Sequence, residues 1–251
     1  MVHIVGAGCG AVDLITVRGK NLLETADVII YAGSLVNPAL LQYAKPGCRI
    51  FDSARMTLEE TTAAILEAEQ SGKTTVRLHT GDPSLYGAIG EQMRELDRLG
   101  IEYDITPGVS AFSGAAAAMK TEYTLPDVSQ TVILTRVSGK TPVPEAEQLR
   151  ALAAHRTTLV LYLSTGLLQK VTQELLAGGY APDAPAAIIY KASWPDEQVY
   201  RCTVASLEQT AREHGITKTA LITVGGFLNS AFARSHLYDP AYPTAYREAT
   251  V

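Results

Sequence analysis

The sequence predicts an α/β protein with two α/β domains, the first with a mainly parallel sheet and the second with a mixed sheet. In the first half, apolar segments of strand length alternate with helix-length segments, as in β-α-β units. In the second half, residues 186–192 and 197–204 both read as strands with no helix between them, which predicts antiparallel pairing. Residues 121–130 lack periodicity and contain Pro126, so we expect domains at 1–120 and 121–251.

Local sequence signals predict where the helices and strands of the first half begin and end. Thr57 and Glu60 have the spacing of a capping box for the helix that follows them, and Gly100 ends the next helix. Apolar runs bounded by polar residues, glycine or proline predict the strands. The predicted strands are 2–5, 28–31, 49–52, 74–80 and 102–106, and the predicted helices are 14–25, 58–70, 88–99 and 112–119.

The second half follows the same rules with less regularity. The predicted strands are 131–137, 158–164, 186–192, 197–204 and 220–227, and the predicted helices are 145–155, 167–177 and 204–213. From residue 230 the chain, with Pro240 and Pro243, reads as an irregular tail.

Composition excludes several classes of protein. Hydrophobic residues make up 47% of the 251 residues, which supports a folded core, and the net charge of −5 argues against a nucleic-acid partner. No apolar run approaches the ~20 residues that span a bilayer, and the first residues read as a strand rather than a signal peptide. Cys9, Cys48 and Cys202 lack metal-ligand spacing, so we expect no metal and a cytoplasmic location.

Residues 76–87, with the sequence VRLHTGDPSLYG, are the most informative segment. An apolar strand runs into Gly81, Asp82 and Pro83 and then toward a helix. Asp82 is suited to cap that helix and Pro83 to its first turn, so a plain helix start explains the pattern. Turns at the carboxyl ends of strands also bind small molecules in α/β proteins, which makes this segment a candidate site.

Two further glycine turns follow strands of the same predicted sheet. Residues 6–11, GAGCGA, fit a loose dinucleotide fingerprint, but the acid that should end the second strand is absent, so NAD binding is a minor alternative. Residues 107–111, PGVSA, lead into a helix of small residues, which predicts close packing. Three such turns are expected to line one edge of the sheet.

These motifs together resemble the tetrapyrrole (corrin/porphyrin) methyltransferase family over nearly the whole chain. The general landmarks are residues 5–8, 13–19, 81–87, 107–111 and 220–225. Within the family the chain is most similar to the precorrin-4 or cobalt-precorrin-4 C11-methyltransferases. The segments that carry that likeness are 31–36, 130–136, 139–144 and 190–197.

The resemblance implies that S-adenosylmethionine lies in a cleft between two domains of a homodimer. Most of the implied cofactor contacts are small or apolar residues, which suggests backbone and packing contacts. The positions that match cofactor contacts are Cys9, Thr80, Gly81, Asp82, Leu85, Ser110, Ala111, Leu163, Ala192 and Leu221. Family members commonly have GAGPGDPD in the first turn, so Cys9 and Ala11 are departures that we expect to loosen it.

The chemistry implied is C-methylation in cobalamin biosynthesis, an in-line displacement that needs alignment more than an acid–base pair. No general base is predicted. A tetrapyrrole acceptor carries carboxylates, and the basic residues expected to meet them are Arg18, Arg55, Arg136, Lys140 and Lys191. Arg77 and Lys20 are further candidates, although any one of these cations could be a solvated surface charge. His79, alone, does not predict a metal site, and Tyr86 and Trp194 could be flat contact surfaces or core.

Four alternatives stay open at this point. The same fold could methylate another precorrin carbon, ribosomal RNA or a protein side chain. The chain could instead be an NAD-dependent oxidoreductase, or a tetrapyrrole carrier without catalytic activity. The expected partners are a small tetrapyrrole and a second copy of the chain, with no nucleic acid and no membrane.

Overall fold

The computed structural model describes residues 1–229 and 231–250, which form two compact units. The first unit consists of Met1–Ala115 together with Lys191–Glu197, and the second of Ala116–Tyr190 and the described residues from Gln198 onward. The chain therefore passes between the units at residues 115–116, 190–191 and 197–198. The predicted domain boundary after residue 120 stays a prediction.

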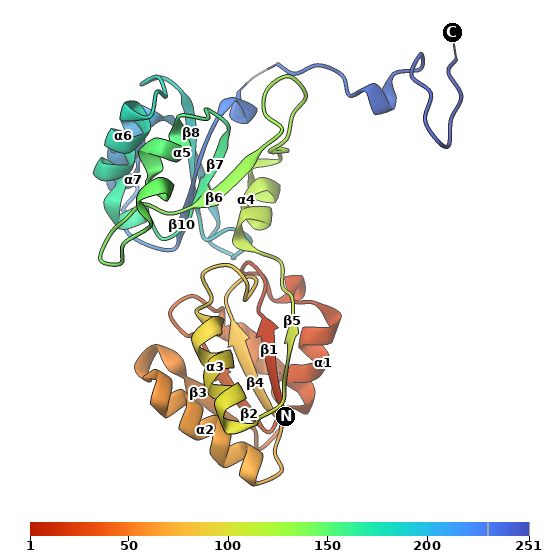
Figure 1. The fold of residues 1–251 in the computed structure, drawn as a ribbon, viewed down its shortest axis with the longest axis vertical. Coiled ribbons are helices and arrows are strands. Elements are labelled where there is room, and N and C mark those ends of the chain that lie inside the picture. The colour runs from red at the N-terminus through yellow and green to blue at the C-terminus, as the bar shows by residue number, and fades with distance from the viewer. Residues whose placement is uncertain (230, 251) are drawn as a thin grey trace. The chain divides into compact units, whose positions relative to one another are not determined.

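The first unit is built on a parallel sheet, as predicted, and helices cover both faces of the sheet. Its strand order is β3-β2-β4-β1-β5, and every pairing is parallel. Helices α2 and α3 cover one face and α1 the other (Figure 1). The strands are β1 (Val2–Gly6), β2 (Val28–Tyr31), β3 (Arg49–Asp52), β4 (Thr75–His79) and β5 (Tyr103–Thr106). The helices are α1 (Val17–Thr25), α2 (Leu58–Gln70) and α3 (Ile89–Leu99), with α4 (Ala111–Met119) starting in this unit.

Alternation along β4 divides the first unit into two cores. Val76 and Leu78 of β4 share a core with Leu23 of α1, whereas Ile30 of β2 shares a second core with residues of α2 and α3 such as Leu96. Both faces are apolar because a parallel sheet is covered on both sides. The capping box predicted before α2 is present, and Gly100 ends α3 in the left-handed conformation with φ 66°.

The second unit has the predicted mixed sheet. Its strand order is β6-β7-β10-β8-β9, in which β6 is parallel to β7 and the other pairings are antiparallel. The strands are β6 (Val132–Thr135), β7 (Thr158–Leu161), β8 (Pro185–Tyr190), β9 (Gln198–Thr203) and β10 (Ala220–Val224). Helices α5 (Leu149–Ala153), α6 (Leu168–Ala177) and α7 (Leu207–Glu213) cover one face (Figure 1).

Several predicted helices begin later than expected because short 3₁₀ turns precede them. The predicted helix 14–25 is a turn at Val12–Leu14 followed by α1, which Thr16 caps by accepting from Gly19 N at 3.1 Å. A turn at Glu145–Glu147 and another at Val204–Ser206 shorten α5 and α7 in the same way. The turn at Pro38–Tyr43 was not predicted, since 3₁₀ turns do not follow the 3.6-residue period.

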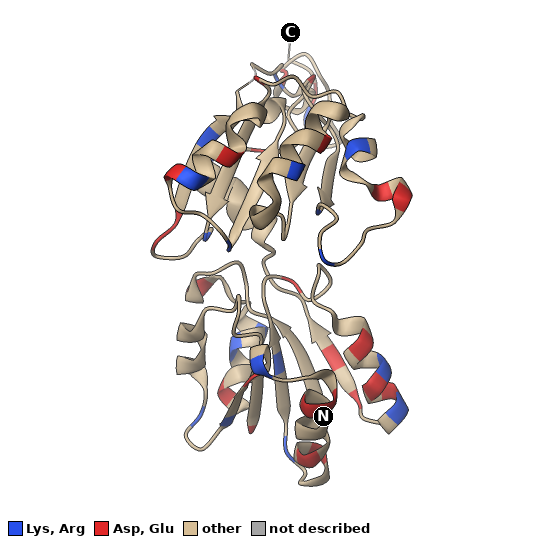
Figure 2. Cartoon of the chain, turned by 90° about the vertical axis from the view of Figure 1, so that its left-hand side faces the viewer, with Lys and Arg blue, Asp and Glu red and all other residues tan. Residues whose placement is uncertain are grey.

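Charges of both signs are interspersed along the helices (Figure 2). This agrees with the net charge of −5. Within the described residues, no helix combines the length and apolar character needed to cross a membrane.

Candidate functional site

The three glycine turns of the first unit meet at the carboxyl end of its sheet. Gly8 N donates to Gly81 O at 3.2 Å, and Gly81 N donates to Gly8 O at 3.0 Å. A Cβ placed on Gly6 would stand 2.6 Å from the Cα of Gly108 and 2.7 Å from the carbonyl oxygen of Gly81. The turns therefore touch through their backbones, and the prediction that they share one sheet edge is confirmed. Only residues without side chains permit so close an approach.

Asp82 joins the second turn to the third. Its Oδ2 accepts from Gly108 N at 2.9 Å, and its Oδ1 accepts from the backbone N of Ser84 at 2.9 Å and from the Ser84 hydroxyl. Burial acts to raise the pKa of Asp82, but these hydrogen bonds together hold it below the ordinary aspartate value. The carboxylate is thus ionised at neutral pH and organises the loop rather than accepting a proton.

The expectation that Asp82 and Pro83 start a helix is wrong. Helix α3 begins only at Ile89, and its N-cap residue is Ala88, which has φ 50° and no side-chain cap. The Asp82 side chain instead closes a local turn with Ser84 and reaches across to Gly108, so its capping capacity is already used.

The first glycine turn is tethered by side chains from two distant segments. Ser193 Oγ accepts from Ala11 N at 2.9 Å and lies 3.2 Å from Cys9 Sγ, while Asn37 Nδ2 donates to Gly10 O at 2.9 Å. Each residue from Cys9 to Ala11 therefore has a polar contact that restrains it, and the expectation that Cys9 and Ala11 loosen the turn stays a prediction.

Close packing completes the surroundings of this turn. A Cβ on Gly10 would stand 2.1 Å from Trp194 Cδ1, so the indole lies directly against the backbone. A Cβ on Gly114 in α4 would stand 2.8 Å from Cys9 Sγ and 3.5 Å from Ala192 Cβ. The small-residue helix α4 thus makes room for Cys9 and Ala192, which the structure brings together.

Most of the residues predicted to bind a cofactor lie in the first unit. Gly81 faces the third turn, since a Cβ there would stand 3.5 Å from Ala111 N and 3.6 Å from Ser110 Cα. The predicted residues of this unit are Cys9, Thr80, Gly81, Asp82, Leu85, Ser110, Ala111 and Ala192.

Leu163 and Leu221 belong to the second unit. Leu163 follows the end of β7, and Leu221 lies near the start of the neighbouring antiparallel strand β10. Thr165 Oγ1, two residues beyond Leu163, donates to Ala220 O at 3.0 Å. Leu163 is 59% exposed and Leu221 is buried. Their role as cofactor contacts stays a prediction.

The basic residues predicted for substrate binding fall into two groups. Arg136 donates to the carbonyl oxygens of Thr141 and Pro142 at 3.0 and 2.7 Å, so it shapes its own loop. Lys191 Nζ lies 2.5 Å from Asp196 Oδ2. The exposed members of the set are Arg18, Arg55 and Lys140. A substrate role stays a prediction for all of them.

Arg77 is a buried structural residue and not the surface charge that the sequence allowed. It is 7% exposed, its Nε donates to Gln92 Oε1 at 2.8 Å, and its Nη1 donates to Ile30 O at 3.1 Å. Burial lowers the pKa of Arg77 to about 10, so the guanidinium stays charged at neutral pH. It fastens α3 to the centre of the sheet.

Two polar atoms at the end of β4 are left without a protein partner. In the described part of the chain, His79 Nε2 and Thr80 Oγ1 are buried and make no hydrogen bond. A buried polar group without a partner costs about 1–3 kcal/mol, so Thr80, beside Gly81, has hydrogen-bonding capacity that a ligand could use. Among the described residues, no His, Cys, Asp and Glu side chains group in a way that could hold a metal ion.

His79 makes the stability of the protein sensitive to acid. Burial, reinforced by the Arg77 charge, lowers the pKa of His79 to about 3, from 6.5. Between these values the unfolded chain binds a proton that the folded chain does not, so the free energy of unfolding falls as the pH is lowered. We expect His79 to contribute up to about 1.4 kcal/mol per pH unit to this fall, measured by denaturant unfolding from pH 7 to pH 5.

The variant His79→Gln should lose this contribution, and the exposed His155 provides a matched control. His155→Gln should keep the slope of the wild type. An unchanged slope in His79→Gln would show that His79 is not held neutral by the fold.

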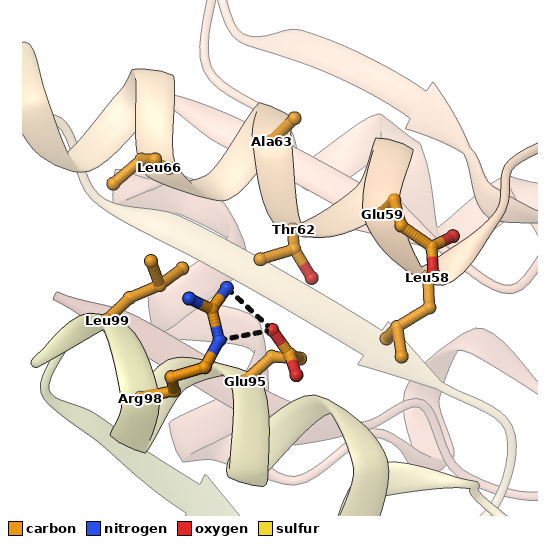
Figure 3. Close-up of a pocket in the computed structure, with 8 residues that line it drawn as sticks. All are labelled: Leu58, Glu59, Thr62, Ala63, Leu66, Glu95, Arg98 and Leu99. Atoms are coloured by element: carbon orange, nitrogen blue, oxygen red, sulfur yellow. Dashed lines mark hydrogen bonds and ion pairs between the residues drawn. The ribbon is translucent and has the colours of Figure 1, made fainter.

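A groove of about 300 Å³ lies between α2 and α3 (Figure 3), and no residue of the glycine turns is among those that line it. The ion pair of Arg98 and Glu95, at 2.9 Å, lies on its α3 side. The lining residues are Leu58, Glu59, Thr62, Ala63, Leu66, Glu95, Arg98 and Leu99. None of the predicted site residues lines it.

Sequence reasoning missed Ser193, Asn37 and Gln92 as parts of the site. Ser193 is 182 residues away from the Ala11 amide that it binds, and no local pattern signals such a contact. The one available signal was the likeness of residues 190–197 to one branch of a family, which marked the segment but not its role.

Sequence comparison finds close relatives along the full chain. The chain is 51% identical over 249 residues to the cobalt-precorrin-4 C(11)-methyltransferase of Methanocaldococcus jannaschii, covering 99% of this chain and 96% of that protein. It is 48% identical to the precorrin-4 C(11)-methyltransferase of a Sinorhizobium species, covering 98% of each.

Solved structures agree with the sequence relatives. A cobalt precorrin-4 methyltransferase matches with a TM-score of 0.89 and 48% identity, covering 91% of this chain and 96% of that one. Uroporphyrin-III C-methyltransferase from Thermus thermophilus, complexed with S-adenosyl homocysteine, matches with a TM-score of 0.74 and 26% identity, covering 91% of this chain and 93% of that one. The profile of the Tetrapyrrole (Corrin/Porphyrin) Methylases matches residues 1–208, and the chain belongs to this family.

Proposed function

We propose that the chain transfers a methyl group from S-adenosylmethionine to C11 of precorrin-4 or cobalt-precorrin-4 in cobalamin biosynthesis. The observation that carries the proposal is the meeting of three glycine turns at one sheet edge, in a chain whose relatives at 48–51% identity are named for this reaction. A cytoplasmic homodimer belongs to the same proposal.

The residues of the first unit fit S-adenosylmethionine on two grounds. Thr80 Oγ1 is buried and has no partner in the described chain, so a polar group of the cofactor would satisfy it. Gly81, Ser110 and Ala111 present backbone close together, which suits a ligand recognised through main-chain groups. We propose that these residues hold the cofactor with Cys9, Asp82, Leu85 and Ala192.

When bound, the cofactor supplies a methyl group already activated on a sulfonium. The protein is then required to align and shield rather than to generate a nucleophile. Asp82 fixes the distance between the second and third turns, and Ser193 and Asn37 fix the first. Asp82 and His79 are poorly suited to act as a general base, because the pKa of Asp82 lies below the ordinary aspartate value and burial lowers the pKa of His79 to about 3.

Arg18, Arg55, Lys140, Arg136 and Lys191 are proposed to meet carboxylates of the tetrapyrrole. The exposed Arg18, Arg55 and Lys140 are the members with the most accessible charge. Complementary charge of this kind raises the rate of encounter and orients an anionic ligand, and its effect falls as salt is added.

The oxidoreductase alternative has no support in the structure. Strand β2 ends at Tyr31 and is followed by Ala32 and Gly33. None of these residues is the aspartate or glutamate that binds a ribose hydroxyl at the end of the second strand in dinucleotide-binding proteins. Asp52, at the end of the neighbouring strand β3, accepts from Gly33 N at 3.1 Å and Ala54 N at 2.9 Å, which occupies one of its oxygens.

Methyl-labelled S-adenosylmethionine tests the proposal. The protein is offered the labelled donor with cobalt-precorrin-4, with total RNA or with a protein extract in separate reactions. We expect label only in the tetrapyrrole, whose mass rises by one methyl group. Label in RNA or protein alone would replace the proposal with a same-fold methyltransferase acting on a macromolecule.

A further inference from the structure

Residues Lys191–Glu197 belong to the first unit although the chain on both sides of them lies in the second. The segment has its own internal hydrogen bonds: Ser193 N donates to Glu197 Oε2 at 2.5 Å, and Trp194 N donates to Lys191 O at 2.9 Å. Lys191 and Ser193 have φ values of 48° and 65°, which are strained for residues other than glycine. Such strain persists where the surroundings over-determine the conformation, often at functional sites.

The strained residue Ser193 is the one whose hydroxyl reaches the first glycine turn. Its Oγ accepts from Ala11 N at 2.9 Å and contacts Cys9 Sγ at 3.2 Å, so one atom restrains residues on both sides of Gly10. Trp194 lies against Gly10 itself, where a Cβ would stand 2.1 Å from the indole. One short segment thus contacts all three residues from Cys9 to Ala11, and Asn37 adds a further hydrogen bond to Gly10 O.

The turn needs such a restraint because of its composition. Gly8 and Gly10 have φ values of 81° and 155°, and glycine samples many backbone conformations when nothing holds it. A turn that must be ordered by its ligand loses affinity, whereas a pre-ordered turn does not.

We propose that Ser193 is a positioning residue that holds the first glycine turn in its cofactor-binding shape. It acts through the Ala11 amide and the Cys9 thiol and not by touching the reacting atoms. The inference rests on the proposed function for the identity of the ligand, S-adenosylmethionine. The restraint itself is a property of the protein alone and is measurable without ligand.

The test compares Ser193→Ala with a matched control. Ser193→Ala removes the acceptor of the Ala11 amide. Ser206→Ala is the control, because the Ser206 hydroxyl also accepts a backbone amide, that of Thr203 at 3.0 Å, but in the second unit. Affinity for S-adenosylhomocysteine is measured by calorimetry, and exchange of the Ala11 amide by NMR without ligand.

We expect Ser193→Ala to bind S-adenosylhomocysteine about fivefold to tenfold more weakly, the loss of roughly one hydrogen bond. Its Ala11 amide should exchange faster, and the KM for S-adenosylmethionine should rise while that for the tetrapyrrole is unchanged. Ser206→Ala should match the wild type in affinity and in Ala11 exchange.

Two results would overturn the inference. One is unchanged affinity and unchanged Ala11 exchange in Ser193→Ala. Another is faster exchange throughout the first unit with a large drop in melting temperature, which would make Ser193 a general structural residue. If the wild type itself fails to bind S-adenosylhomocysteine, the proposed function fails, and Ala11 exchange still decides whether the restraint exists.

Discussion

Replacing Gly108 by alanine is expected to abolish cofactor binding. The added Cβ would stand 2.1 Å from the carbonyl oxygen of Gly81 and 2.8 Å from the Cα of Gly6, both backbone atoms of the other two turns. Backbone held in a sheet edge cannot rotate away as a side chain can, so the turns must separate. We expect destabilisation of about 2–3 kcal/mol, a melting temperature lower by about 5–10 °C, and no measurable affinity for S-adenosylhomocysteine.

Gly90→Ala is the matched control. Gly90 lies in α3 of the same unit, and a Cβ there would meet nothing within 4 Å. Alanine favours helix over glycine by up to about 1 kcal/mol, so the melting temperature should stay the same or rise slightly. If Gly108→Ala binds S-adenosylhomocysteine as well as Gly90→Ala does, the three turns do not form the cofactor site.

Asp82→Ala is expected to have the second largest effect. The substitution leaves the Gly108 amide and the Ser84 amide without the carboxylate that joins them, at 2.9 Å each. A hydrogen bond to a charged group contributes about 1.5–3 kcal/mol. Because Asp82 is partly exposed, we expect each of these two hydrogen bonds to contribute an amount near the lower end of that range. We expect affinity for S-adenosylhomocysteine to fall about 100-fold, with a smaller loss for Asp82→Asn, which keeps one acceptor oxygen.

The exposed Asp183 of the second unit provides the control, and Asp183→Ala should bind as the wild type does. The pH dependence gives an independent check. The folded-state pKa of Asp82 lies below its ordinary 3.8, so its stabilisation is complete above that value and is lost as the pH falls through the lower folded value. Affinity that already declines between pH 7 and pH 5 in the wild type, but not in Asp82→Asn, would contradict this assignment.

The sequence predicted the ends of helices and strands closely where apolar runs and capping residues marked the same boundary. The strands Val28–Tyr31 and Arg49–Asp52 and the helix Leu58–Gln70 have the predicted ends, because short apolar runs and the Thr57–Glu60 capping box mark them. The mixed second sheet followed from two adjacent strand patterns, confirmed as the antiparallel pair β8 and β9. The ends of several helices were less well predicted, since 3₁₀ turns such as Val12–Leu14 carry no distinct period.

The candidate site was predictable only in part. The meeting of the three turns follows from parallel topology, because each turn comes after a strand that ends at the same edge. The role of Arg77 depends on its hydrogen bonds to Gln92 and to Ile30 O. The role of Ser193 depends on its hydrogen bond to the Ala11 amide. Such contacts exist only after tertiary packing, so composition and periodicity cannot reveal them.

The position of the transferred methyl group tests the central claim most directly. The protein is incubated with S-adenosylmethionine carrying a ¹³C-methyl group and with precorrin-4, either metal-free or loaded with cobalt. The product is then examined by mass spectrometry and ¹³C NMR. The account predicts one added methyl group at C11 of at least one of the two rings. A methyl group at any other ring carbon, or no transfer to either ring from a protein that binds S-adenosylhomocysteine, would contradict it.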